Sequence, residues 1–187
     1  IINTEDIGTG KIAEILNIKL EDITNIEYEV SIKQIENEVV EKMEDVAKKF
    51  SQESIIPPIS FEITAKTTAI DGTINESVID KFDYYTERVL EVPEGVGPSK
   101  ITTGIVFNSD LTYVHIPTVV YERDGVWYAK VNSLTNSTYS VIWNPTEVKS
   151  VENHWAKDAV NDMASRLVIC NPEEFNPDRS FSGKAYL

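Results

Sequence analysis

The sequence contains little of the chemistry that most metal and cofactor sites require. It has one cysteine, Cys170, and two histidines, His115 and His154. A single thiol excludes an internal disulfide and a zinc site built from several thiolates. We therefore expect no metal site and no cofactor.

Long hydrophobic runs are also missing. No apolar segment approaches the roughly 20 residues of a membrane-spanning helix, so we predict no membrane insertion. The first residues lack the basic segment followed by an apolar segment that marks a signal peptide. We expect any export signal to lie outside the sequence given.

Positive charge is scarce. The chain has 17 Lys and Arg against 31 Asp and Glu, which gives a formal net charge of −14 at pH 7. This charge repels phosphate backbones, and no stripe of basic residues interrupts it. We therefore predict no binding to nucleic acid. The acidic surface favours solubility without identifying a partner.

No catalytic constellation stands out. No serine lies in the Gly-x-Ser-x-Gly setting of a hydrolase nucleophile. Asp6–Lys11 lacks the full spacing of a phosphate-binding loop, so we interpret it as a turn. A glycoside hydrolase needs only two carboxylates, but no pair is distinguished among the 31 acids. We predict no catalytic residue and no enzyme.

The first element that is clearly present is an amphipathic helix. Five apolar residues follow at helical spacing, namely Ile35, Val39, Met43, Val46 and Phe50. Pro57 and Pro58 prevent any continuation, so we predict a helix over about 35–50. Residues 1–34 give mixed signals, with a helical turn near Ile12 and alternation over 26–32.

Residues 59–143 show the patterns of β-strands. Apolar and polar residues alternate over 59–65, and further strands are expected at 85–92, 102–107, 112–121, 126–132 and 139–143. Asp124-Gly125 predicts a type I′ hairpin, because both residues tolerate positive φ. The predicted fold class is α+β: mainly antiparallel β, as a sheet or sandwich, with one packed amphipathic helix.

The apolar period changes after Pro145. Asn153 is favoured as an N-cap, and Trp155, Ala159, Met163 and Leu167 follow at helical spacing. This predicts a short C-terminal helical segment. We therefore divide the chain into a β-rich module over 1–146 and a second segment over 147–187.

Two motifs in the second segment resemble a known family. Residues 148–160 are similar to the opening of an S-layer-homology repeat, an F-x-D-V-x-x-H-W-A pattern that leads into a helix. Phe175–Arg179 resembles the F-x-P-x-x loop found later in the same repeat. Residues 59–144 resemble the module that precedes such repeats in clostridial surface proteins. The resemblance implies a Gram-positive extracellular protein of the cell wall or S-layer that ends in an incomplete repeat.

The resemblance also implies a partner. In that family three tandem repeats form grooves that bind a secondary cell-wall polysaccharide through a T-R-A-E element. Here Ser182-Gly183-Lys184-Ala185 stands in its place, so Gly183 replaces the arginine. The resemblance assigns polymer binding to Trp155, Ser182 and Lys184. For Trp155, its place on the apolar stripe favours packing over a role in the groove.

These observations lead to three hypotheses of function. The first is a non-catalytic structural or spacer module beside wall-anchoring repeats, with self-association through the helix of residues 153–167 as a further expectation. The second is a carbohydrate-binding module that uses aromatics of the 112–132 hairpin, with Tyr128 as an exposed sugar-stacking platform. Trp127, in phase with Ala129 and Val131, is expected in the core. A carboxylate-based glycan hydrolase is the least favoured.

Overall fold

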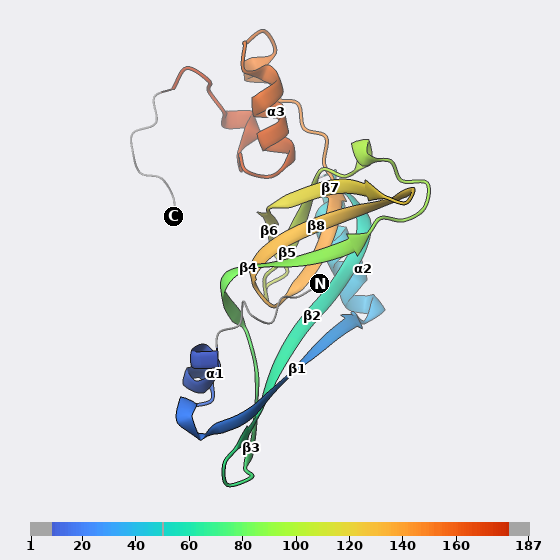
Figure 1. The fold of residues 1–187 in the computed structure, drawn as a ribbon. Coiled ribbons are helices and arrows are strands. Elements are labelled where there is room, and N and C mark those ends of the chain that lie inside the picture. Colours follow the sequence, from blue (N-terminus) through green and yellow to red (C-terminus); the bar gives the residue numbers. More distant parts are fainter. Residues whose placement is uncertain (1–8, 50, 180–187) are drawn as a thin grey trace. The chain divides into compact units, whose positions relative to one another are not determined.

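The computed structural model describes residues 9–49 and 51–179 (Figure 1). The chain divides into two compact units, Ile1–Trp143 and Asn144–Leu187. Most of the described elements are antiparallel strands, and the helices are few and short. The predicted α+β fold class, mainly antiparallel β, is therefore confirmed.

Two α-helices belong to the first unit. α1 spans Thr9–Ile15, and α2 spans Asn37–Lys49, close to the predicted 35–50. Met43 and Ala47 of α2 are buried and lie against the sheet residues Ile105, Phe107 and Ile142. The helix therefore packs on the sheet through one apolar side, as its sequence period predicts. No helix in the described part of the chain is long and apolar enough to cross a membrane.

The larger sheet has six strands in the order β1-β2-β9-β5-β6, with β3 also paired to β2. Its strands are β1 (Ile23–Gln34), β2 (Glu53–Ala69), β3 (Ile74–Val78), β5 (Thr103–Phe107), β6 (Tyr113–Ile116) and β9 (Thr138–Trp143). Every pairing in this sheet is antiparallel. The long strand β2 therefore has β1 along one side, and β9 and β3 share its other side.

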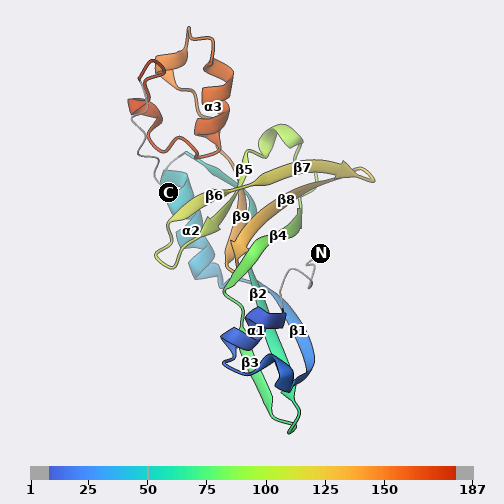
Figure 2. The same ribbon diagram turned by 60° about the vertical axis from the view of Figure 1, so that its left-hand side comes forward.

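A smaller sheet has three strands in the order β4-β8-β7 (Figure 2). These are β4 (Lys81–Glu91), β7 (Thr118–Arg123) and β8 (Val126–Thr135). The turn between β7 and β8 has Asp124 at φ 53° and Gly125 at φ 80°. Positive φ at both central residues is the requirement of a type I′ turn, so the predicted hairpin is confirmed.

The two sheets of the first unit share a hydrophobic core. Phe61 of β2, Leu90 of β4, Val131 of β8 and Tyr139 of β9 all belong to it. The Phe61 and Tyr139 rings meet edge to face, with centroids 5.8 Å apart. A second cluster lies between α1 and the far half of β2, and it includes Ile12 and Ile63. The core therefore continues along β2.

Proline positions correct two predicted strand boundaries. The strand expected over 112–121 is divided at Pro117 into β6 and β7, which belong to different sheets. Proline has no N–H to donate, and its carbonyl accepts from the Asn132 N–H at 2.9 Å. The strand expected from residue 59 begins at Glu53 and passes through Pro57 and Pro58. The pairing with β9 is irregular there, which is where a strand tolerates proline.

The second unit is small, and its described regular elements are all helical. It contains α3 (Lys157–Ser165) and the short 3-10 turns Lys149–Val151 and Pro172–Glu174. Its core consists of Val148, Val151, Val160 and Ala164, with Phe175 packed against them.

The structure corrects the predicted packing of Trp155. This residue lies before α3, and 91% of its surface is exposed. Met163 is half exposed, whereas Val160 and Ala164 are buried. The buried side of α3 is therefore the one with Val160 and Ala164, next to the predicted stripe of Trp155, Ala159 and Met163. Val148 and Val151 pack against this buried side. The helix also begins at Lys157 rather than directly after Asn153.

Candidate functional site

The outer face of the β7–β8 hairpin carries a stacked pair of tyrosines. Tyr121 and Tyr128 are directly opposite in the strand register, and Glu91 of β4 is opposite Tyr128 on its other side. The two ring centroids are 5.6 Å apart, and the ring planes are inclined by 23°. Both tyrosines are half-buried. We call Tyr121 and Tyr128 the tyrosine platform.

Charged side chains surround the tyrosine platform. The guanidinium carbon of Arg123 lies 4.9 Å from the centre of the Tyr128 ring. A hydrogen bond with Tyr128 raises the pKa of Arg123 above its ordinary value. On the other side, Lys130 Nζ lies 2.8 Å from Glu87 Oε1, and this contact raises the pKa of Lys130. Both cations therefore stay charged throughout the neutral range.

The tyrosine platform has the elements of a sugar-binding surface. An aromatic ring offers an apolar face to the C–H groups of a sugar, and neighbouring charged groups offer hydrogen bonds to its hydroxyls. The mutual stacking of Tyr121 and Tyr128 covers part of each ring. Tyr128 is therefore only half-exposed, and the ring surface that it offers to a sugar is smaller than the exposed platform that we predicted from the sequence. Tyr139, another aromatic near the hairpin, is completely buried and adds nothing to it.

Trp127 lies on the opposite face of the hairpin. It is half-buried and packs against the main core, as predicted from its phase with Ala129 and Val131. It also lines a cleft of about 300 Å³ with residues 91–96 and the turn residue Gly125. The Val92 N–H donates to the Trp127 carbonyl at 2.9 Å, which holds the loop against the hairpin. Sequence reasoning did not find this cleft, because the loop and the hairpin are separated along the chain.

A buried arginine was also missed by sequence reasoning. Arg88 of β4 is 1% exposed, and its guanidinium carbon lies 4.6 Å from the centre of the Tyr139 ring. It also lies 5.7 Å from the Phe61 ring centre and 5.8 Å from that of Phe82. The only signal in the sequence is the alternation of β4, which places Arg88 in phase with the buried Thr86 and Leu90.

Carbonyl oxygens accept hydrogen bonds from both terminal nitrogens of the Arg88 guanidinium. Nη1 donates to the Thr86 carbonyl at 3.0 Å, and Nη2 donates to the Thr135 carbonyl at 2.8 Å and to Asn136 Oδ1 at 3.1 Å. Within the described residues, the Arg88 Nε has no hydrogen-bond partner. Burial lowers the pKa of Arg88, but arginine stays protonated in proteins. Arg88 is therefore a structural cation of the core.

The second unit carries an aromatic pair before α3, in which Trp155 is exposed and His154 is half-buried. The rings of His154 and Trp155 have centroids 5.4 Å apart. His154 Nδ1 accepts a hydrogen bond from the Ala156 N–H at 3.1 Å, so a neutral ring carries its proton on Nε2. That atom lies 3.9 Å from Asp178 Oδ1. The Nε2 side of the ring therefore faces the Asp178 carboxylate beside the exposed Trp155.

The two motifs that resemble an S-layer-homology repeat contact each other. The Ser150 hydroxyl donates to the Phe175 carbonyl at 2.5 Å, and the Phe175 side chain packs on the cluster of Val148, Val151, Val160 and Ala164. The contact between His154 and Asp178 also joins the two motifs. Residues 148–160 and 175–179 therefore form one packed arrangement.

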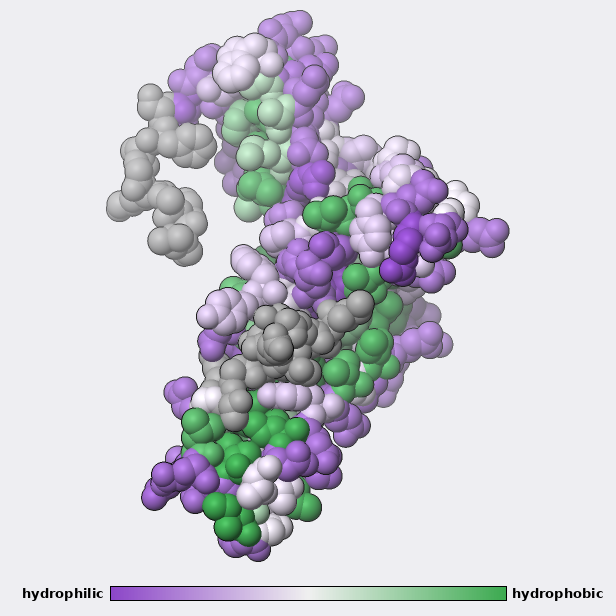
Figure 3. Space-filling model, in the orientation of Figure 1, coloured by the Kyte–Doolittle hydropathy of each residue, from purple (hydrophilic) through white to green (hydrophobic). Residues whose placement is uncertain are grey.

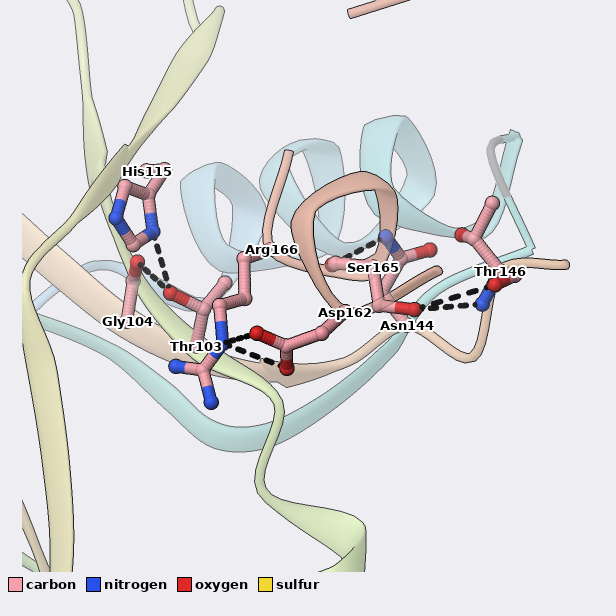
Figure 4. Close-up of polar contacts among 8 residues, drawn as sticks. All are labelled: Thr103, Gly104, His115, Asn144, Thr146, Asp162, Ser165 and Arg166. Atoms are coloured by element: carbon pink, nitrogen blue, oxygen red, sulfur yellow. Dashed lines mark hydrogen bonds and ion pairs between the residues drawn. The ribbon is translucent and has the colours of Figure 1, made fainter. Parts of the chain in front are cut away.

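Several polar contacts within each unit position its backbone (Figure 4). In the second unit, Asn144 Nδ2 donates to the Ser165 carbonyl at 2.7 Å, and the Thr146 N–H donates to Ser165 Oγ at 2.9 Å. These bonds hold the start of the unit to the end of α3. In the first unit, His115 Nδ1 lies 2.7 Å from Thr103 Oγ1. This supports the expectation that His115 is a sheet residue.

The structure describes only some of the residues to which the sequence analysis assigned a binding role. Ser182 and Lys184 lie outside the described residues, so their assignment to polymer binding stays a prediction. Tyr128 and Trp155 belong to different units, and each is described above as a separate surface. Across residues 9–49 and 51–179, no three His, Cys, Asp or Glu side chains are grouped as metal ligands would be.

Comparisons of the chain with family models, with curated proteins and with solved structures found no match. The resemblance to S-layer-homology repeats therefore stays a prediction that rests on its quoted motifs. Functional proposals for this chain depend on the geometry of its own residues.

Proposed function

We propose that this chain is a non-catalytic structural module of a bacterial cell-surface protein, in which residues 147–187 belong to a wall-anchoring repeat. The observation that supports it is the contact between residues 148–160 and 175–179, the two segments similar to an S-layer-homology repeat. Two motifs that belong to one repeat should share one core, and here they do. The β-rich first unit then serves as an extracellular spacer.

The proposed ligand of the second unit is a secondary cell-wall polysaccharide. Trp155 offers an aromatic surface that is 91% exposed, and aromatic faces stack on sugar rings. His154 lies beside it, and its Nε2 is the ring N–H donor because Nδ1 accepts from the Ala156 N–H. A sugar polymer would therefore meet both an apolar face and a hydrogen-bond donor at this position. Lys184 would contribute a positive charge.

A sedimentation assay with purified Gram-positive cell walls tests the proposal. The chain should bind intact walls and should lose binding when the secondary polymer is extracted. Trp155→Ala should weaken wall binding by about tenfold, because it removes the stacking surface. Met163→Ala is the matched control, since Met163 is another exposed apolar residue of the same unit, and it should bind as the parent chain does.

Two results would contradict the anchoring role. One is the absence of binding to intact walls at micromolar concentrations. The other is binding that survives extraction of the polymer or is unchanged by Trp155→Ala.

A carbohydrate-binding function of the first unit is the second candidate. The observation that favours it is the tyrosine platform with Arg123 and Lys130 beside it. Affinity electrophoresis in gels that contain neutral polysaccharides tests it. Retardation should disappear in Tyr128→Ala but persist in Tyr84→Ala, an exposed tyrosine of β4 outside the platform. Equal retardation of both variants would reject the platform as the binding surface.

A further inference from the structure

β1 is an open edge of the six-stranded sheet. One side of the strand pairs with β2 from Ile23 to Gln34. Within residues 9–49 and 51–179, no strand pairs with its other side (Figure 1). Edge strands in soluble proteins are usually short, or are interrupted by proline or several lysines. β1 has 12 residues, no proline and a single lysine, so its edge is open to another strand.

The apolar face of β1 is covered along only half of its length. Ile26 and Tyr28 pack against the cluster that includes Ile12 of α1. Further along the same face, Val30 is 44% exposed and Ile32 is 62% exposed. These two residues are opposite Ile63 and Phe61 of β2, both of which are buried. Figure 3 shows apolar surface along this part of the unit and around α1 and β3.

The polar face of β1 has opposite charges at its two ends. Glu27 and Glu29 lie toward its start, and Lys33 lies near its end. Lys33 Nζ is 3.4 Å from Glu62 Oε1 of β2, with both side chains largely exposed. An exposed pair of this kind contributes little, so Lys33 remains available to a second carboxylate.

We propose that β1 pairs with β1 of a second copy of this chain, antiparallel and about a two-fold axis at Val30. Val30 then lies opposite its symmetry mate, and Tyr28 lies opposite Ile32 of the other copy. On the polar face, Glu27 lies opposite Lys33 of the other copy, and the symmetry makes this ion pair twice. The exposed side chains of Val30 and Ile32 gain apolar neighbours, and a continuous sheet crosses the two chains.

Other registers of the same strand are less favourable. A shift by one residue sets the apolar face of one copy against the polar face of the other. A two-fold axis at Glu29 puts Glu29 directly opposite Glu29 of the other copy. Parallel pairing in register puts each of Glu27, Glu29 and Lys33 opposite its own copy, so that like charges face each other three times. With a two-fold axis at Ser31, Glu29 lies opposite Lys33 of the other copy, but fewer residues of β1 are paired than with the axis at Val30. The axis at Val30 therefore combines matched faces, opposite charges and the longer pairing.

The net charge of −14 on each chain opposes association at low salt. At physiological ionic strength the Debye length is about 8 Å, so charges far from β1 are largely screened. The facing charges of β1 lie within that distance. Dimerisation should therefore be measured near 0.15 M salt, where the local contacts decide the outcome.

Analytical ultracentrifugation of the full chain with charge-reversed variants tests the proposal. The parent chain should show a reversible dimer at tens to hundreds of micromolar. Lys33→Glu and Glu27→Lys should each weaken it at least about tenfold, because each places two pairs of like charges opposite each other. The double variant Glu27→Lys/Lys33→Glu should restore it. Lys42→Glu on α2 changes the net charge as Lys33→Glu does and should leave the dimer unchanged.

A disulfide cross-link reports the register directly. In a Cys170→Ser background, Val30→Cys should form a covalent dimer under mild oxidation, since each residue faces its symmetry mate. Ile74→Cys, on an exposed position of β3, should not form one at the same rate. Circular dichroism of every variant verifies that it is folded. The proposal is overturned if the folded parent chain stays monomeric at millimolar concentration. It is also overturned if a dimer is insensitive to both single reversals, or if Val30→Cys cross-links no faster than Ile74→Cys.

Discussion

Among the residues that the structure describes, carbonyl oxygens and aromatic rings rather than a carboxylate hold Arg88 in the core of the first unit. A buried guanidinium loses its hydration, and the Tyr139 ring and three oxygen acceptors replace part of it. The bond to Thr135 joins β4 to the last residue of β8, and the contact with the Tyr139 ring joins β4 to β9 of the larger sheet. Arg88 therefore connects strands of both sheets.

Replacing Arg88 by methionine should lower the free energy of unfolding. Methionine fills a similar apolar volume, but the Thr135 carbonyl and Asn136 Oδ1 lose their donor, which costs about 1–3 kcal/mol. Urea unfolding followed by circular dichroism measures the change. Arg123→Met, at an exposed hairpin position, should change stability by less than about 0.5 kcal/mol. Equal stability of the Arg88→Met variant and the parent would show that these hydrogen bonds contribute nothing.

Two aspartates in turns should titrate at unusually low pH. The Thr112 N–H and hydroxyl donate to Asp110 at 3.0 and 2.6 Å, and the Thr73 N–H donates to Asp71 at 2.9 Å. These bonds lower the pKa of both carboxyl groups below their ordinary value of 3.8. Because the pKa is lower in the folded state, the ionised carboxylates stabilise the folded protein at neutral pH. This stabilisation is lost as pH falls through the pKa of the folded state, where the carboxylates become protonated.

Carboxyl carbon shifts followed by NMR between pH 2 and 6 measure both values. Thr112→Val removes one donor to Asp110 and should move the Asp110 pKa back toward 3.8, while Asp71 stays unchanged. Titration of Asp110 at or above 3.8 in the parent chain would contradict the hydrogen bonds described.

At the scale of elements, β5 passes close to β8 at a glycine. A Cβ on Gly104 would lie 2.6 Å from Val131 Cγ1 and 2.8 Å from Thr118 Oγ1. The Gly104 N–H also donates to Thr118 Oγ1 at 2.7 Å, so the larger sheet meets the β6–β7 corner here. This close approach lies next to Pro117, where the chain passes from the larger sheet to the smaller one.

Gly104→Ala should destabilise the first unit by about 1–3 kcal/mol, because the core must shift to accept the methyl group. Thermal or urea unfolding checks this. Gly97→Ala is the matched control, since Gly97 has negative φ and a methyl group there would meet no atom within 4 Å, and its stability should match that of the parent. A destabilisation of equal size in both variants would contradict the close contact as its cause, because Gly→Ala at an unstrained position restricts the unfolded chain and should not destabilise the fold.

Secondary structure was predictable where it depends on neighbours along the chain. The alternation over 59–65 and 126–132 predicted parts of β2 and β8, and Asp124-Gly125 predicted the hairpin turn. The strand through Pro57 and Pro58 and the division at Pro117 were not predicted. Those outcomes depend on which strand lies beside each proline, and the local sequence does not contain that information.

On the scale of the whole molecule, the two units have separate hydrophobic clusters. The cluster of Val148, Val151, Val160 and Ala164 contains only residues of the second unit. Val151→Ala should therefore raise amide hydrogen exchange in residues 148–165 by about tenfold or more, because it removes buried methyl groups from a small core. Exchange in β5 and β9 should not change. Mass spectrometry of peptic fragments measures both.

The reciprocal variant is the control. Val131→Ala removes the same groups from the core of the first unit and should raise exchange in β8 and β9 but not in residues 148–165. Equal acceleration in both units by either variant would show that the units unfold together.

Trp155 illustrates what the sequence left open at the candidate site. The apolar stripe of α3 can be counted from Trp155 or from Ala156, and both counts have helical spacing. Contact with Val148 and Val151 selects the second count, so Trp155 stays exposed. Likewise, alternation placed Tyr128 on the outer face, but only the strand register showed Tyr121 stacked on it.

The sequence alone determined the fold class, the positions of α2 and most strands, the type I′ turn, and the scarcity of metal ligands. These features follow from periodicity, φ requirements and composition, which act over a few residues. The tertiary structure decided the two-sheet topology, the burial of Arg88, the open edge of β1 and the exposure of Trp155. Each of these depends on which distant segment covers a given face, and that choice is made by packing of the whole chain.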